Sequence, residues 1–117
     1  MQSLKKNKDF KKVYNRGKSY ASKYLVLYKL KNNLKNNRYG FSISKKVANA
    51  VGRNKFKRRL REIIRELEKR KKIKVSYDVI FIARKPVIKL DYHQLKSDLV
   101  FLLKKMDLHN DWGVFLC

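Results

Sequence analysis

The sequence predicts an α+β fold, in which one sheet packs against helices as a two-layer sandwich within a single domain. Three stretches favour β-strands because apolar residues alternate or run continuously, and three others repeat apolar residues at helical spacing. At 117 residues the chain has room for one domain with a modest core. With 44% hydrophobic and 12% aromatic residues, its composition can fill that core.

The N-terminal region predicts a short helix. Phe10, Val13 and Tyr14 recur at positions i, i+3 and i+4, so they share one helical face. Asn7 can act as the N-cap, and Gly17 supplies the stop. On spacing alone, two aromatic residues placed like Phe10 and Tyr14 are more often part of a core than a surface on which bases stack.

Two strands are predicted next along the chain. From Tyr24 to Leu30 the residues favour β-structure and alternate between two faces, and from Tyr39 to Ser44 aromatic and branched residues alternate with glycine and serine. The asparagine-rich segment 32–37 predicts a polar turn between them, so we expect the two strands to pair as a hairpin. A third strand could lie near residues 19–24 or near Val47.

A long central helix is predicted where the apolar period changes from two to 3.6. It should begin between Asn49 and Asn54 and end near Arg70. Its apolar stripe consists of Phe56, Leu60, Ile63, Ile64 and Leu67.

An interior strand and a last helix are predicted after a basic linker. The strand, residues 77–83, is apolar on both faces, as expected of a strand inside a sheet, and Pro86 closes it. Asp91 and Gln94 resemble a capping box, which predicts a helix from there to about Lys105.

The charge of the chain predicts a polyanionic partner. The formal net charge is +23, and between Asp9 and Glu62 there are seventeen Lys and Arg without one acidic residue. Repulsion on this scale destabilises a free protein. Aromatic residues punctuate the same stretch, so nucleic acid is the first candidate.

Export and membrane attachment are not expected. The basic N-terminus lacks an apolar segment, and no window approaches the roughly 20 apolar residues of a membrane span. Cys117 is the only cysteine and can make no internal disulfide. A reducing, cytoplasmic setting fits these features.

The central helix segregates its charges. On a helical wheel, the sector next to the apolar stripe contains no acidic residue. It holds cationic and amide residues, namely Arg53, Asn54, Lys57, Arg58, Arg61 and Arg65. A merely solvated face would mix both signs at i and i+4, so this sector predicts phosphate binding. Asn49 and Asn54 could each cap the helix, contact RNA or hold a hydrated metal ion.

The segment from Ser44 to Arg58 closely resembles the signature of the protein subunit family of bacterial ribonuclease P. The resemblance covers about residues 3–106. We expect residues 1–117 to form one domain, in which residues 107–117 are a C-terminal tail. The resemblance rests on Lys46, Asn49-Ala50-Val51, Arg53-Asn54 and Lys57-Arg58, with support from Asp9-Phe10, Tyr14 and Tyr77 to Pro86. Lys55 departs from the family, which usually has an arginine there.

This resemblance implies a sandwich like the second domain of ribosomal protein S5, with a left-handed βαβ crossover. It implies two RNA surfaces. The catalytic RNA would contact Lys45, Lys46, Asn49, Arg53, Asn54, Lys55, Lys57, Arg58 and Arg61. The 5′ leader of precursor tRNA would occupy a cleft formed by Phe10, Tyr14, Tyr28, Ser44 and Arg65. Mg²⁺ would be bound mainly by the RNA, with Asn49 and Asn54 in indirect roles, and protein and RNA would associate 1:1.

No catalytic group is evident in the protein. His93 and His109 lie apart in sequence, Cys117 is terminal, and the carboxylates show no metal-ligand spacing. A protein-only nuclease would have to bring together Asp91, Asp98 and Glu62. Together with the resemblance, which implies an endonuclease that removes 5′ leaders, this lack of a catalytic group leads us to expect a noncatalytic subunit, with a small basic ribosomal protein as the alternative.

Overall fold

A computed structural model describes residues 1–110 of the protein. Five strands form one mixed sheet in the order β1-β4-β5-β3-β2, with β5 at its centre. The strands are β1 (Gln2–Ser3), β2 (Lys18–Ala21), β3 (Leu25–Lys31), β4 (Arg38–Ser42) and β5 (Tyr77–Ala83). The β1–β4 and β4–β5 pairs are parallel, whereas β3 pairs antiparallel with both β5 and β2.

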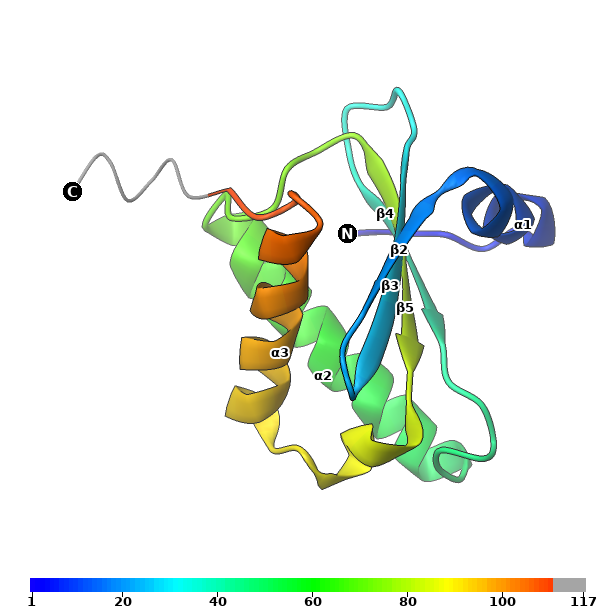
Figure 1. The fold of residues 1–117 in the computed structure, drawn as a ribbon, viewed down its shortest axis with the longest axis vertical. Helices are drawn as coiled ribbons and strands as arrows, with labels where there is room; N and C mark the ends of the chain where they lie inside the picture. The colour runs from blue at the N-terminus through cyan, green and yellow to red at the C-terminus, as the bar shows by residue number, and fades with distance from the viewer. Residues whose placement is uncertain (111–117) are drawn as a thin grey trace.

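Helices cover the two faces of the sheet unequally. Helices α2 (Ala50–Lys69) and α3 (Tyr92–Lys105) lie on one face, and the short α1 (Asn7–Arg16) lies on the other (Figure 1). A 3₁₀ helix, η1 (Lys85–Lys89), links β5 to α3. The larger core lies between the sheet and α2 and α3, whereas a small cluster of Leu4, Val13 and Ile80 lies under α1.

The helix predictions and the interior strand are confirmed. Helix α2 begins directly after Asn49, whose side-chain oxygen accepts a hydrogen bond from the Gly52 N–H at 2.8 Å. Helix α3 begins with the predicted capping box of Asp91 and Gln94. The run 77–83 is the central strand, and the third strand lies at 18–21, near one of the two positions considered.

The predicted hairpin is wrong, because β5 lies between β3 and β4. The asparagine segment instead bridges the start of β5. Asn37 is buried, accepts the Tyr77 N–H and donates to the Lys74 carbonyl, both at 2.8 Å. The Asn32 amide donates to Asp78 at 2.9 Å. These side chains satisfy backbone and carboxylate groups that a simple turn would leave to water.

Details at the ends of the helices also differ from the predictions. Lys6, not Asn7, is the N-cap of α1 and makes no side-chain capping bond. Gly17 follows α1 as predicted, but its φ of −78° is not left-handed. A Cβ there would lie 2.5 Å from the Val13 carbonyl oxygen and 2.7 Å from that of Lys29, so close backbone approach requires the glycine. Leu108, which follows α3, is fully buried and belongs to the larger core.

β1 and η1 were not predicted, and the chain after residue 110 lies outside the described residues. The parallel β4–α2–β5 connection is the unit to which the predicted left-handed crossover applies. Its hand stays a prediction.

A partly buried ion pair joins the parallel strands β4 and β5. Arg38 on β4 donates to both carboxylate oxygens of Asp78 on β5, from Nε at 2.8 Å and Nη2 at 2.6 Å. The Asp78 side chain is 5% exposed, and its hydrogen bonds raise the pKa of the Arg38 guanidinium. Arg38 also lies 3.7 Å from Asp9 on α1, so this cluster connects the short helix to the sheet.

We predict that Arg38→Met lowers the free energy of unfolding by about 3 kcal/mol, because it leaves the buried Asp78 carboxylate without its cation. Urea denaturation followed by circular dichroism measures the change. Lys35→Met, at an exposed loop position, serves as the control and should be nearly neutral. An Arg38→Met protein as stable as the parent would show that the pair does not hold β4 to β5.

Candidate nucleic-acid interface

Three aromatic rings, Phe10, Tyr14 and Tyr28, form a continuous group that we call the aromatic surface. The Phe10 and Tyr14 ring centroids are 6.4 Å apart, and Tyr14 meets Tyr28 edge-on at 5.0 Å. Phe10 and Tyr28 also pack on the small cluster under α1, whereas Tyr14 is 38% exposed. The core and surface interpretations therefore both apply: two rings anchor α1 and the third faces solvent.

The sheet beside this surface carries small or half-buried side chains. Strand register places Ser42, Ile82, Val26 and Ala21 in one row, adjacent to the row containing Tyr28. Ser42 hydrogen-bonds the Tyr14 hydroxyl, and burial, which outweighs this bond, raises the pKa of that hydroxyl. The side chains of this row project little from the sheet, and they lie next to the exposed Tyr14 ring. This geometry suits a base stacked on the ring.

The basic residues of α2 occupy its outer side and both of its flanks. Asn54, Arg58 and Arg65 are exposed, and Lys57 and Arg61 are half-buried on one flank. Arg61 lies over the Phe41 ring at 5.4 Å. Lys55 turns to the opposite flank, where it lines a hollow with Arg59 and Lys89. The predicted RNA-binding set is thus spread around the helix rather than gathered on one side.

The loop before α2 positions the rest of the predicted set. Lys45 and Lys46 are exposed in the turn after β4, and Ser44 is exposed beside them. Arg53 donates to the Ala48 carbonyl at 2.9 Å, so it braces this loop as well as adding charge. Asn49 acts as the N-cap, whereas Asn54 lies one turn inside the helix and caps nothing.

The acid-free sector predicted for α2 needs one correction. Glu68 falls at nearly the same angle on the helix as Lys57 and Arg61, although it lies near the C-terminal end. Its carboxylate interacts with the hydroxyl of Tyr39, and burial is the main cause that raises the pKa of that hydroxyl. Glu68 therefore neutralises no part of the N-terminal half of α2.

A hollow at the β4 edge links the basic helix to the aromatic surface. Phe10 from α1 lines it together with Lys57 and Arg61 from α2 and with Lys5. The Phe10 ring lies against Gly40, where a Cβ would come within 2.6 Å of the ring. Lys5 was missed by sequence reasoning, because only the position of β1 beside β4 brings it here.

The acidic side chains of residues 1–110 are engaged in local contacts. Asp78 accepts hydrogen bonds from Arg38, and Asp9 forms a longer ion pair with the same guanidinium. Glu66 accepts from Lys96, Glu68 from Tyr39, Asp98 from Ser22 and Asp107 from Lys74. Asp91 caps α3, and Glu62 lies near Tyr92. Within this part of the chain, no three His, Cys, Asp or Glu side chains lie close enough to hold a metal ion. Asp91, Asp98 and Glu62 are not brought together.

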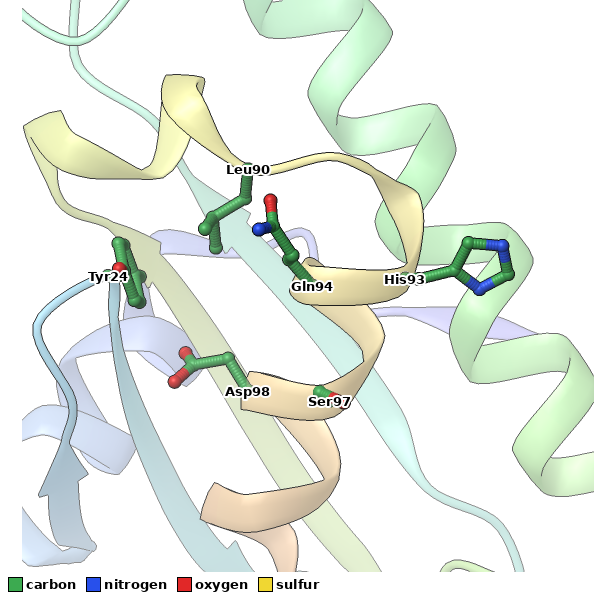
Figure 2. Close-up of a pocket in the computed structure, with 6 residues that line it drawn as sticks. All are labelled: Tyr24, Leu90, His93, Gln94, Ser97 and Asp98. Carbon is green, nitrogen blue, oxygen red and sulfur yellow. The ribbon is translucent and has the colours of Figure 1, made fainter.

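His93 and Asp98 line a common hollow beside Tyr24, but they do not face each other. Figure 2 shows His93 pointing away from Asp98, on opposite sides of α3. The Asp98 carboxylate accepts the Ser22 hydroxyl at 2.7 Å, which holds the β2–β3 connection to α3. These two residues make no acid–base pair.

Comparison with known proteins decides the family. The Ribonuclease P family model matches residues 1–107. The ribonuclease P protein component of Clostridium botulinum is 49% identical over 107 residues, which is 92% of this chain and 96% of that protein. The chain belongs to the ribonuclease P protein family. It is a subunit of an RNA-processing enzyme that acts in tRNA maturation, and the ribosomal alternative is set aside.

Solved structures of the ribonuclease P family share the fold. The Staphylococcus aureus RNase P protein superposes with a TM-score of 0.83 at 36% identity, over 94% of this chain and 99% of that one. The Thermotoga maritima RNase P protein superposes with a TM-score of 0.81 at 30% identity, over 90% of this chain and 97% of that one. In the described residues, no helix has the length and apolar character needed to cross a membrane.

We predict that binding to the ribonuclease P RNA weakens steeply with salt, because cations on α2 release counterions from phosphates. Replacing Arg58, exposed on the outer side of α2, by Ala should lower the slope of log K against log salt by about one. Filter binding over a salt series gives the slope, with Lys35→Ala as a control of equal charge change. An affinity insensitive to salt would contradict the electrostatic interpretation.

Proposed function

We propose that this ribonuclease P subunit binds the catalytic RNA through α2 and its preceding loop, and the 5′ leader of precursor tRNA through the aromatic surface. The observation that carries the proposal is the contact series Phe10–Tyr14–Tyr28 beside an uncovered row of the sheet. Single-stranded RNA binds where aromatic rings lie next to positive charge. The hollow shared by Phe10, Lys57 and Arg61 joins the two features at the β4 edge.

Catalysis is assigned to the RNA subunit, in a 1:1 complex in the cytoplasm. Mg²⁺ held mainly by that RNA would assist phosphodiester hydrolysis. The Asn49 side-chain oxygen accepts one hydrogen bond as the cap of α2, whereas the Asn54 side chain is exposed and caps nothing, so Asn54 is the freer of the two predicted asparagines to contact a hydrated ion. The protein would bind the leader, reduce repulsion between RNA backbones and thereby strengthen substrate binding.

We predict that Tyr14→Ala weakens holoenzyme binding of precursor tRNA with a leader by about 5- to 150-fold. This range corresponds to the loss of one stacked base, at roughly 1–3 kcal/mol. Equilibrium binding of precursor and mature tRNA in Ca²⁺ measures the effect, and mature tRNA should bind as it does to the parent.

Phe10→Ala tests the same surface but needs a stability control. Because its ring packs on the cluster under α1, we expect a loss of stability alongside the loss of leader binding. Melting of both variants therefore precedes the binding assay. If the folded Tyr14→Ala protein discriminates precursor from mature tRNA as well as the parent, the leader site does not include this ring.

We predict that removing acidic or imidazole groups leaves the chemical step within a few-fold of the parent. Asp91→Asn, Asp98→Asn, Glu62→Gln and His93→Ala test this, because losing a general acid or base typically costs 10²–10⁴-fold. Single-turnover cleavage at saturating holoenzyme and Mg²⁺ isolates the step. A hundredfold loss in any folded variant would place catalysis in the protein. Any loss of cleavage activity from Lys57→Ala should instead be partly recovered by added Mg²⁺, because the role of this residue is electrostatic.

A further inference from the structure

A second basic hollow lies on the flank of α2 that faces away from the β4 edge. It has a volume of about 410 Å³ and lies between α2 and η1. Its floor is apolar, formed by Ala48, Phe56, Val87 and Leu90, of which Val87 is 2% exposed. We call it the α2–η1 hollow.

Three cations stand around the α2–η1 hollow: Lys55 and Arg59 from α2, and Lys89 from η1. Among residues 1–110 none of the three makes a salt bridge. The single acidic residue of the lining, Asp91, already accepts the Gln94 N–H at 2.8 Å as the cap of α3. The lining therefore holds three cations against one carboxylate, so positive charge is in excess at this rim.

Apolar surface accompanies this charge. Ile88 lines the hollow and is 60% exposed, and Val51 on the first turn of α2 is 77% exposed. Neither side chain is buried in the protein core. The sugar and base of a nucleotide can cover them while its phosphate reaches the cations. Cations around an apolar floor suit a polyanion with apolar parts, such as RNA.

The α2–η1 hollow is continuous with the proposed RNA-binding side of α2. Around the helix, Arg58 lies between Arg61 on one flank and Lys55 and Arg59 on the other. Glu62 is the acidic residue that also falls on this second flank, about one turn beyond Arg59, and the three cations outnumber it. An RNA that covers the outer side of α2 would bring its backbone toward both flanks. The charge of the rim suits the same partner as the rest of the helix.

We infer that the α2–η1 hollow is a second contact site for the catalytic RNA, with Arg59 and Lys89 binding its phosphates and Ile88 covering a sugar or base. This inference rests on the proposed binding of α2 to that RNA. Helix α2 is then held by RNA on both flanks, and η1, which sequence patterns did not predict, acts as an RNA-binding element.

A charge-matched pair of double variants tests the contribution of the rim. Arg59→Gln with Lys89→Gln should lower the slope of log K against log salt by about two, since two phosphate contacts are lost. Lys31→Gln with Lys35→Gln removes equal charge at exposed positions near the β3–β4 loop, at the other end of the molecule from η1 (Figure 1), and should change the slope little. Glutamine retains much of the aliphatic stem, so the floor stays covered. Equal effects of the two pairs would overturn the inference.

Tethered cleavage locates the contact independently. In a protein with Cys117→Ser, an iron–EDTA probe is attached at Ile88→Cys, at Asn54→Cys or at the exposed Leu34→Cys. We expect the catalytic RNA to be cut from positions 88 and 54 and much less from 34. Cuts from 54 without cuts from 88 would overturn the second site while leaving the proposed function intact. If neither position cuts, the proposed function fails as well.

Discussion

Excess positive charge is the constraint on which the rest of this structure depends. Thirty-two cationic side chains face nine acidic ones, so repulsion opposes folding wherever no polyanion is bound. Within residues 1–110, several of the few carboxylates join separate elements. Asp78 holds Arg38 across the central parallel strands, Asp98 ties the β2–β3 connection to α3, and Glu66 binds Lys96 between α2 and α3. The first half of α2 contains no acidic residue, so its cations are left for an external partner.

Local patterns predicted most of what local interactions determine. Of the two candidate caps of α2, Asn49 is the one used, whereas Asn7 does not cap α1. The capping box at Asp91 and the apolar stripe of α2 each depend on residues within a few positions, and both are present. The hairpin failed for the opposite reason. Whether β3 pairs with β4 or with β5 depends on contacts about 50 residues apart, such as Leu30 opposite Asp78, which no short-range pattern encodes.

For the candidate site, charge and the family resemblance predicted an RNA-binding set on α2, because a run of cations is visible in the sequence. That assignment stays a prediction. Neither charge nor the resemblance could show that Lys55 turns away from Lys57, or that Lys5 joins Phe10 at the β4 edge, since both depend on how the elements pack. Gly40 shows the same limit: its lack of a side chain makes room for the Phe10 ring, which belongs to a helix about 30 residues earlier.

The arrangement of elements gives this small domain two separate surfaces for the two RNAs that we propose it binds. Helix α1 covers only part of its face of the sheet, because it has ten residues and buries only Val13 fully. The uncovered row beside Tyr14 therefore stays accessible, while α2 occupies the opposite face with its cations outward. The two surfaces meet only around the β4 edge, where Lys57 and Arg61 approach Phe10. An RNA strand passing this edge would meet aromatic rings on one side and cations on the other, so in the proposed complex the sheet would set the spacing between the leader and the catalytic RNA.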